Sequence, residues 1–248
     1  MAIHPKLQAA FQQRNALKVI SGLMNFDAER VAAVVVAADR GGATFVDIAA
    51  HVNLVKLAKE LTTLPICVSA VEPEKLVAAV EVGADLVEIG NFDAFYAQGR
   101  KFTATEVLDL THQTRAFLPH TALSVTVPHW LPLDQQVQLA EALVQAGADI
   151  IQTEGGASSQ PAHAGTLGLI EKAAPTIAAA YEISRAVTVP VLCASGLSNV
   201  TGRLAIAAGA SGIGVGSAIN KLSSEVEMIA TVRNLVESLA VPAVKASV

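Results

Sequence analysis

Three charged side chains stand within short apolar stretches of the sequence, where an unpaired charge would be costly. Lys18, Asp47 and Glu88 each have an apolar neighbour on both sides. If these stretches are strands, the three side chains can share one interior face, where charges must pair or pKa values must move. Such a cluster can supply a general acid and base or a Schiff-base amine; an inert buried ion-pair network is the alternative. Lys18 stands near the start of its stretch, toward the expected non-catalytic end, which favours Asp47 and Glu88.

Glycine-rich turns follow the last two apolar stretches, Val191–Ser195 and Ser211–Gly216. Glycine lets a backbone approach a ligand closely, and unpaired N–H groups at a helix start attract anions. Ser217 is expected to cap the short helix that follows. Small residues that only permit tight packing are the alternative. We expect both turns to form a phosphate site together with the glycine pair that follows another apolar stretch, Asp149–Glu154. The expected residues are Ser195, Gly196, Gly214, Gly216, Ser217, Gly155 and Gly156.

Two further side chains stand where other strands should end. Glu154 precedes the polar segment Gly155–Gly168, which is long for a loop and can form a lid over a ligand. His129 lies next to the only tryptophan, where an imidazole can either move protons or hold the loop in place. No residue spacing requires a metal. Weaker candidates at the same rim are Asn25, Asp27, His51, Asn53, Asn91 and Asp93.

Short apolar stretches alternate with helix-forming segments along the whole chain. Between the expected strands lie segments long enough for helices, which predicts parallel strands joined by right-handed crossovers. A doubly wound sheet usually has five or six strands and a glycine-rich turn after its first strand, whereas here that turn follows the last. We therefore predict an aldolase-type (β/α)8 TIM barrel in one domain, residues 1–248, with an N-terminal extension (1–15) and a tail (240–248). The expected strands are Leu17–Gly22, Thr44–Ala49, Ile66–Ala70, Asp85–Gly90, Thr121–Val127, Asp149–Glu154, Val191–Ser195 and Ser211–Gly216.

Composition narrows the classes of protein. The 248 residues are 52% hydrophobic and 16% charged, with a net charge of −5 and no run of basic residues that would bind nucleic acid. The longest apolar run, Val31–Ala38, is far shorter than a membrane span needs, and no secretory signal is visible. Cys67 and Cys193 are expected to pack in the core. Apolar helices such as Val31–Ala38 and Ala173–Tyr181 leave homo-oligomer formation open.

Several motifs stand in or next to the expected strands: Lys18-Val-Ile-Ser-Gly, Val68-Ser-Ala-Val-Glu-Pro-Glu, Val87-Glu-Ile-Gly-Asn-Phe-Asp, Ser124-Val-Thr-Val-Pro-His, Gln152-Thr-Glu-Gly-Gly and Cys193-Ala-Ser-Gly-Leu-Ser. Together they resemble the Ycf23 family of cyanobacteria and algal plastids. The resemblance runs from about Lys18 to Leu239, and it implies an aldolase-type barrel in the cytoplasm of a cyanobacterial cell or in a plastid stroma, without a settled activity. The last two strands also resemble those of phosphosugar epimerases, thiazole synthase and FMN-dependent barrels, which implies phosphate contacts at the two glycine-rich turns.

Three functions fit these residues. The first is a lyase, isomerase or synthase that acts on a small phosphorylated metabolite by carboxylate acid–base chemistry. The second is an oxidoreductase that holds FMN by its phosphate, with the flavin near Ser21-Gly-Leu-Met. The third is a non-catalytic protein that binds a metabolite. Gln152 and Glu154 stand where a Schiff-base aldolase carries a lysine on strand 6, so the fold alone does not decide among the three.

Overall fold

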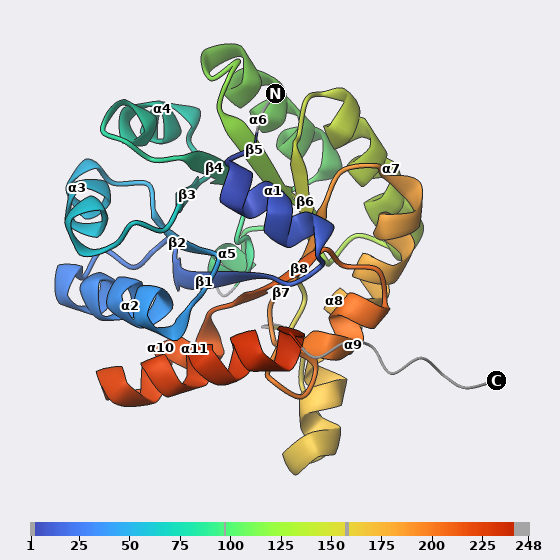
Figure 1. Cartoon of the computed structure of the whole chain (residues 1–248). Helices are drawn as coiled ribbons and strands as arrows, with labels where there is room; N and C mark the ends of the chain where they lie inside the picture. The colour runs from blue at the N-terminus through green and yellow to red at the C-terminus, as the bar shows by residue number, and fades with distance from the viewer. Residues whose placement is uncertain (1–2, 97, 157–158, 241–248) are drawn as a thin grey trace.

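Parallel strands form a closed barrel, and helices surround it (Figure 1). The computed structural model describes residues 3–96, 98–156 and 159–240. Within that part of the chain the strands are β1 (Ala16–Gly22), β2 (Phe45–Ala49), β3 (Ile66–Ala70), β4 (Leu86–Ile89), β5 (Ala122–Thr126), β6 (Ile150–Gln152), β7 (Val191–Ala194) and β8 (Gly212–Val215). The helices are α1 (Pro5–Gln12), α2 (Ala28–Gly41), α3 (Val52–Leu61), α4 (Pro73–Glu81), α5 (Asp93–Tyr96), α6 (Ala104–Phe117), α7 (Leu133–Gln145), α8 (Gly165–Ala186), α9 (Gly202–Ala207), α10 (Ser217–Asn220) and α11 (Glu225–Ala240).

The strand order confirms the predicted (β/α)8 barrel. Each strand pairs in parallel with the next, and β8 pairs with β1 to close the ring. The sixth strand, Ile150–Gln152, is shorter at both ends than the predicted Asp149–Glu154. Just before it, the Asp149 carboxylate accepts hydrogen bonds from Leu123 N and Arg115. The tail predicted from residue 240 lies outside the described residues after Ala240.

The predicted N-terminal extension contains a helix that closes one end of the barrel. In Figure 1, α1 lies across that end, and its Leu7 and Phe11 are buried. They pack on side chains that fill this end of the barrel interior: Ala16, Phe45, Cys67, Leu86, Ala122, Ile150 and Leu192. These residues form an apolar layer that closes this end of the barrel interior.

The interior changes from apolar to polar two residues further along the strands. Since side chains on a strand alternate with a period of two, the next inward positions are those of Lys18, Asp47, Ser69, Glu88, Ser124 and Gln152, which are all buried. The predicted inward face of the three charged residues is therefore confirmed. On β8 the matching position is Gly214, which pairs with Lys18 in the strand register.

Helices cover the outside of the barrel and bury their apolar faces on it. Val31, Val34 and Val35 of α2 are fully buried, as is Ala173 of α8. In the sequence these apolar helix residues were compatible with a homo-oligomer interface, but in the structure they pack within the single chain. Tyr181 of α8, in contrast, is exposed. No helix in the described residues is long and apolar enough to cross a membrane.

Candidate functional site

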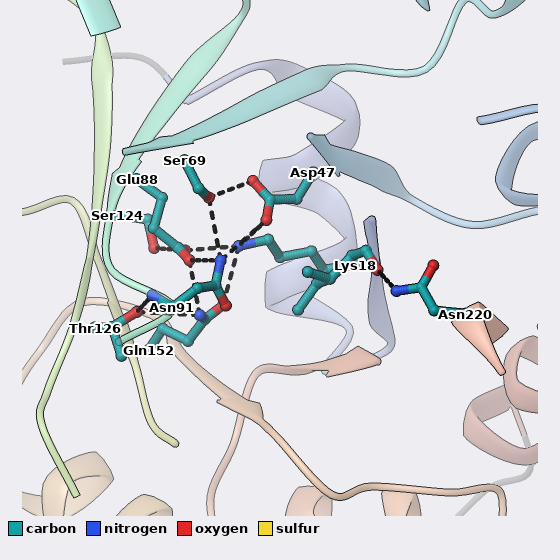
Figure 2. A network of polar contacts seen from close by, with 10 residues as sticks. Lys18, Asp47, Ser69, Glu88, Asn91, Ser124, Thr126, Gln152 and Asn220 are labelled. Atoms are coloured by element: carbon teal, nitrogen blue, oxygen red, sulfur yellow. Dashed lines mark hydrogen bonds and ion pairs between the residues drawn. The ribbon is translucent and has the colours of Figure 1, made fainter. Parts of the chain in front are cut away.

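A buried charge network occupies the middle of the barrel (Figure 2). Lys18 Nζ lies 2.6 Å from Glu88 Oε2, 3.1 Å from Gln152 Oε1 and 3.7 Å from Asp47 Oδ2. The side chains of Lys18, Asp47 and Glu88 are completely shielded from solvent. Three residues that the sequence singled out thus form one cluster. The Lys18 ammonium reaches the same level as the two carboxylates although its backbone stands early in β1.

Neutral side chains complete the hydrogen bonding of the network. Ser124 Oγ and Gln152 Nε2 each donate to Glu88 at 2.8 Å. Ser69 Oγ donates to Asp47 Oδ1 at 2.6 Å, and Asn91 Nδ2 lies 3.2 Å from Asp47 Oδ2. Every oxygen of the two carboxylates therefore has a polar partner, which a buried charge requires.

Two carboxylates share one ammonium, and this decides the charge states. Desolvation lowers the pKa of Lys18, but the charges of Asp47 and Glu88 outweigh it and raise the pKa above its ordinary value. Burial raises the pKa of Asp47 to about 6, against the opposing effect of Lys18. The Lys18 amine is therefore held protonated, which disfavours the Schiff-base role, since that chemistry needs a neutral amine.

A cavity of about 300 Å³ opens above the network at the carboxyl ends of the strands. Its walls include Ser195 and Gly196 after β7, and Gly216 and Ser217 after β8. These four belong to the predicted phosphate site, so the structure brings the two glycine-rich turns to one cavity. The floor is formed by Ile20, Asn91 and Gln152.

The other predicted phosphate residues lie in the packing around the cavity. A Cβ on Gly214 would stand 2.9 Å from that of Ala194, inside the barrel wall. A Cβ on Gly156 would stand 2.3 Å from the carbonyl oxygen of Ser195, so this glycine lets the segment after β6 touch the turn after β7. A Cβ on Gly155 would meet Pro175 and His129. These glycines support the shape of the site.

The prediction that Ser217 caps the short helix after β8 is wrong. Ser217 is the first residue of α10, and Gly216 occupies the N-cap position without a side-chain hydrogen bond. A glycine there keeps the N-terminal amides of the turn free of a capping side chain. Both residues still line the cavity.

Two lysines in the cavity wall were not identified from the sequence. Lys172 comes from α8 and Lys221 directly follows α10. The signal for Lys221 was its short distance from the Gly216–Ser217 turn. Lys172 could not be recognised, because only the packing of α8 against the barrel turns that residue toward the cavity. Both supply positive charge beside the two glycine-rich turns.

The backbone is strained at two residues that line the cavity. Ser195 has a φ of 73° and Asn91 a φ of 60°, in the left-handed region that favours glycine. Such outliers are concentrated at ligand sites, where the surrounding structure holds them in place. At Asn91 the turn directs the side chain back into the buried network, so this residue contacts both the network and the cavity.

A second polar cluster forms the wall near β6. Glu154 Oε1 accepts hydrogen bonds from the Tyr96 hydroxyl and, at 3.2 Å, from His129 N, and it also lies 3.2 Å from Nδ1 of the His129 imidazole. Asp93 Oδ2 accepts from Ser195 Oγ at 2.8 Å. The structure thus joins the predicted Glu154 and His129 and adds Asp93, a weaker candidate in the sequence, and Tyr96, which had no sequence signal.

Burial dominates the electrostatics of this second cluster. Desolvation raises the pKa of Glu154 and of Asp93, and the charge of Asp93 raises that of Glu154 further. Desolvation lowers the pKa of His129, but its hydrogen bond to Glu154 and the charges of Glu154 and Asp93 together outweigh this and raise the pKa. Burial and the Glu154 charge also raise the pKa of Tyr96. The cluster holds acidic groups at an unusually high proton affinity beside an open cavity.

The segment after β6 is attached to α8. Glu171 Oε2 accepts from Ala162 N at 2.8 Å and from His163 N at 3.1 Å. Because α8 begins at Gly165, the segment is shorter than the predicted Gly155–Gly168 loop. Residues 157 and 158 of that loop lie outside the described part of the chain. A lid role stays a prediction.

Sequence comparison identifies the family. The family model described as "Protein of unknown function (DUF561)" matches residues 3–245. A relative from Cyanophora paradoxa, the "Uncharacterized protein ycf23", is 47% identical over 225 residues, which cover 90% of this chain and 92% of the relative. The chain belongs to the Ycf23 family. A second member, from the red alga Pyropia yezoensis, is 39% identical over 229 residues, covering 92% and 84% of the two chains.

Solved structures of low sequence identity share the fold. Thiamine phosphate pyrophosphorylase from Pyrococcus furiosus superposes with a TM-score of 0.59 at 19% identity, covering 92% of this Ycf23 protein and 98% of that chain. (S)-3-O-geranylgeranylglyceryl phosphate synthase from Thermoplasma acidophilum, in complex with its substrate sn-glycerol-1-phosphate, gives a TM-score of 0.59 at 13% identity, covering 96% and 99%. These neighbours share the (β/α)8 barrel fold predicted from the sequence.

Proposed function

We propose that this Ycf23 protein binds a small phosphorylated metabolite in the cavity at the carboxyl ends of the strands and acts on it as a lyase, isomerase or synthase. The proposal rests on one observation: groups that can bind a phosphate and carboxylates that can transfer protons line the same cavity. Ser195, Gly196, Gly216 and Ser217 line it together with two lysines, and carboxylates line it from the side of β4 and β6.

The phosphate end of the ligand would lie between the two glycine-rich turns. Lys172 and Lys221 offer two positive charges there, and a phosphate dianion is stabilised by ammonium groups and by backbone amides at a helix start. Two structural neighbours carry a phosphorylated compound in their names, and one was solved with its phosphorylated substrate. In barrels of this type the phosphate commonly binds after strands 7 and 8.

The reacting end of the ligand would face Glu154 and Asp93. Both carboxylates line the same cavity as the lysines, and both stand in positions where burial raises the pKa. A cavity of about 300 Å³ suits a small metabolite. The buried Lys18, Asp47 and Glu88 network lies beneath the floor, so it would act on such a ligand only through Asn91 and Gln152; its catalytic role stays a prediction.

Binding of inorganic phosphate, measured by isothermal titration calorimetry, tests the proposal. In the variant Lys172→Gln/Lys221→Gln we expect the affinity to fall at least about tenfold, because a hydrogen bond to a charged group contributes about 1.5–3 kcal/mol. The control Lys56→Gln removes an exposed lysine of α3 and should bind phosphate like the wild type. Equal affinities in all three proteins would refute the phosphate site.

Native mass spectrometry of the gently purified protein would name the ligand class. A retained phosphorylated compound supports the proposal, and its release by competing phosphate locates it in the cavity. The FMN alternative stays a prediction; a purified protein that absorbs near 450 nm, the general property of a flavin, would favour it. The sequence placed the flavin near Ser21-Gly-Leu-Met. In the structure, Leu23 and Met24 of this stretch line a separate cavity of about 160 Å³.

A further inference from the structure

Asp93, His129 and Glu154 bring three metal-ligand side chains together at the cavity wall. Asp93 opens α5, His129 follows β5, and Glu154 follows β6. One ligand atom from each residue lies within 4.8 Å of the other two. Residues from three separate segments converge here, which distinguishes the cluster from a run of acidic residues on one surface.

Two buried carboxylate oxygens of this cluster have no hydrogen-bond partner within the described residues. Glu154 is only 3% exposed, and its Oε2 makes no hydrogen bond. Oδ1 of Asp93 is also buried and accepts no hydrogen bond, and the His129 imidazole lies 3.9 Å from it. Elsewhere in the barrel, each oxygen of the Asp47 and Glu88 carboxylates is paired. An unpaired buried carboxylate oxygen is costly, and two neighbouring ones repel each other. A cation between them would remove both penalties.

We propose that Asp93, His129 and Glu154 bind one divalent first-row transition-metal ion, of the Mn²⁺ or Zn²⁺ class. His129 Nδ1 lies 3.9 Å from Asp93 Oδ1 and 3.2 Å from Glu154 Oε1. Such ions bind imidazole nitrogen and carboxylate oxygen at about 2.0–2.2 Å, so two ligand atoms of one ion stand about 3–4 Å apart. The imidazole favours a transition metal over Mg²⁺ or Ca²⁺, which prefer oxygen ligands.

The surrounding hydrogen bonds orient the ligands as metal sites require. The Tyr96 hydroxyl and the backbone N–H of His129 donate to Glu154, and Ser195 donates to Asp93. Donors of this kind fix the rotamers of ligating carboxylates. To bind the ion, His129 would take the neutral tautomer with its proton on Nε2, which leaves Nδ1 free to coordinate. Three protein ligands leave coordination positions open toward the cavity.

The ion would deepen the proposed function. Because Asp93 and Glu154 line the same cavity as Lys172, a metal ion on this wall could polarise an oxygen of the bound metabolite. That role rests on the proposed function, whereas metal binding itself does not. The two can therefore be tested separately.

Metal binding is tested with Mn²⁺ as the probe, on protein first freed of metal with a chelator. Free Mn²⁺ is counted by electron paramagnetic resonance. We expect the wild type to bind one ion per chain and Glu154→Gln and Asp93→Asn to lose at least about tenfold in affinity. Both substitutions keep side-chain size, and circular dichroism checks folding. If Glu154→Gln does not fold, Asp93→Asn, at the half-buried position, still gives the answer.

Glu171→Gln is the matched control. It removes a carboxylate that lies 2.6 Å from another imidazole, His163, on the exposed side of the same segment, and it should bind Mn²⁺ like the wild type. Trp130, the only tryptophan, adjoins His129, so Co²⁺ should quench its fluorescence in wild type and control but not in Asp93→Asn.

Two results would overturn the metal site: no saturable Mn²⁺ binding to the wild type, or equal affinity in the wild type and both cluster variants. Phosphate titrated in the presence of chelator reports on the proposed function alone. Metal binding without phosphate binding would refute the phosphate site and keep the metal site, and the reverse result would do the opposite.

Discussion

Replacing Lys18 with methionine removes the ammonium from the centre of the barrel and keeps most of the side-chain volume. Two carboxylates then stand in a space with no solvent and no positive charge, since Lys18 Nζ was the cation 2.6 Å from Glu88 and 3.7 Å from Asp47. Removing one partner of a buried ion pair costs about 3–5 kcal/mol, chiefly because the remaining charge is left uncompensated. We expect Lys18→Met to lose this much stability at pH 8.

The magnitude can be read as a shift of the melting temperature. For a chain of this size, 1 kcal/mol changes Tm by about 2–4 °C, so Tm should fall by about 6–20 °C at pH 8. The loss should be smaller at pH 5. Without Lys18, burial raises the folded pKa of Asp47 with no ammonium to oppose it. This carboxyl group therefore destabilises the variant least at low pH, and the stability of the variant falls as pH rises through the folded pKa.

Thermal unfolding followed by circular dichroism at pH 5 and pH 8 measures both effects. Lys75→Met is the matched control, because Lys75 pairs with Glu72 at 3.1 Å but both side chains are about half exposed. An exposed pair contributes at most about 1 kcal/mol, so its Tm should change little. The triple variant Lys18→Met/Asp47→Asn/Glu88→Gln should recover much of the lost stability, because it removes the stranded charges.

Two outcomes would refute this reasoning. If Lys18→Met and Lys75→Met had the same Tm at pH 8, Lys18 would not stabilise the two buried carboxylates. A loss of the same size at pH 5 and pH 8 would show that lost packing, rather than uncompensated charge, is the cause.

The remaining predictions concern one carboxyl group and one glycine contact. Burial raises the folded pKa of Asp47 from 3.8 to about 6, so this group stabilises the fold below about pH 4 and loses that contribution as pH rises through 6. The difference in Tm between Asp47→Asn and the wild type should therefore move in favour of the variant between pH 4.5 and pH 7.5; an equal difference at both pH values contradicts the raised pKa. Gly156→Ala places a Cβ 2.3 Å from the Ser195 carbonyl oxygen, and calorimetry should show weaker phosphate binding as the turn after β7 is displaced. In the control Gly165→Ala the new Cβ meets nothing within 4 Å, so any effect comes only from the backbone strain of an alanine at a φ of 66°, and the phosphate affinity should stay unchanged. Equal affinities in both variants would show that the Gly156 contact does not shape the site.

Part of the candidate site could be recognised before the structure was known. Ser195, Gly196, Gly216 and Ser217 were found because glycine-rich turns after the last two strands are a local signal with a known position in a barrel. Glu154 and His129 were found as polar residues at strand ends. Their pairing with each other and with Asp93 was not visible, because they come from different βα loops and only the closing of the barrel brings them together.

Local sequence patterns were sufficient to predict the barrel and the polarity of its interior. Apolar stretches at regular spacing set the strands, and a period of two set which side chains face inward, so the location of Lys18, Asp47 and Glu88 followed from local rules. Tertiary structure alone decided which of these groups touch. Lys172 reaches the cavity because α8 packs against the barrel, and Asp93, His129 and Glu154 come within 4.8 Å of one another because separate loops end there. Contacts between segments distant in the chain depend on how the strands close into the barrel. A local sequence pattern does not predict the distances between such segments.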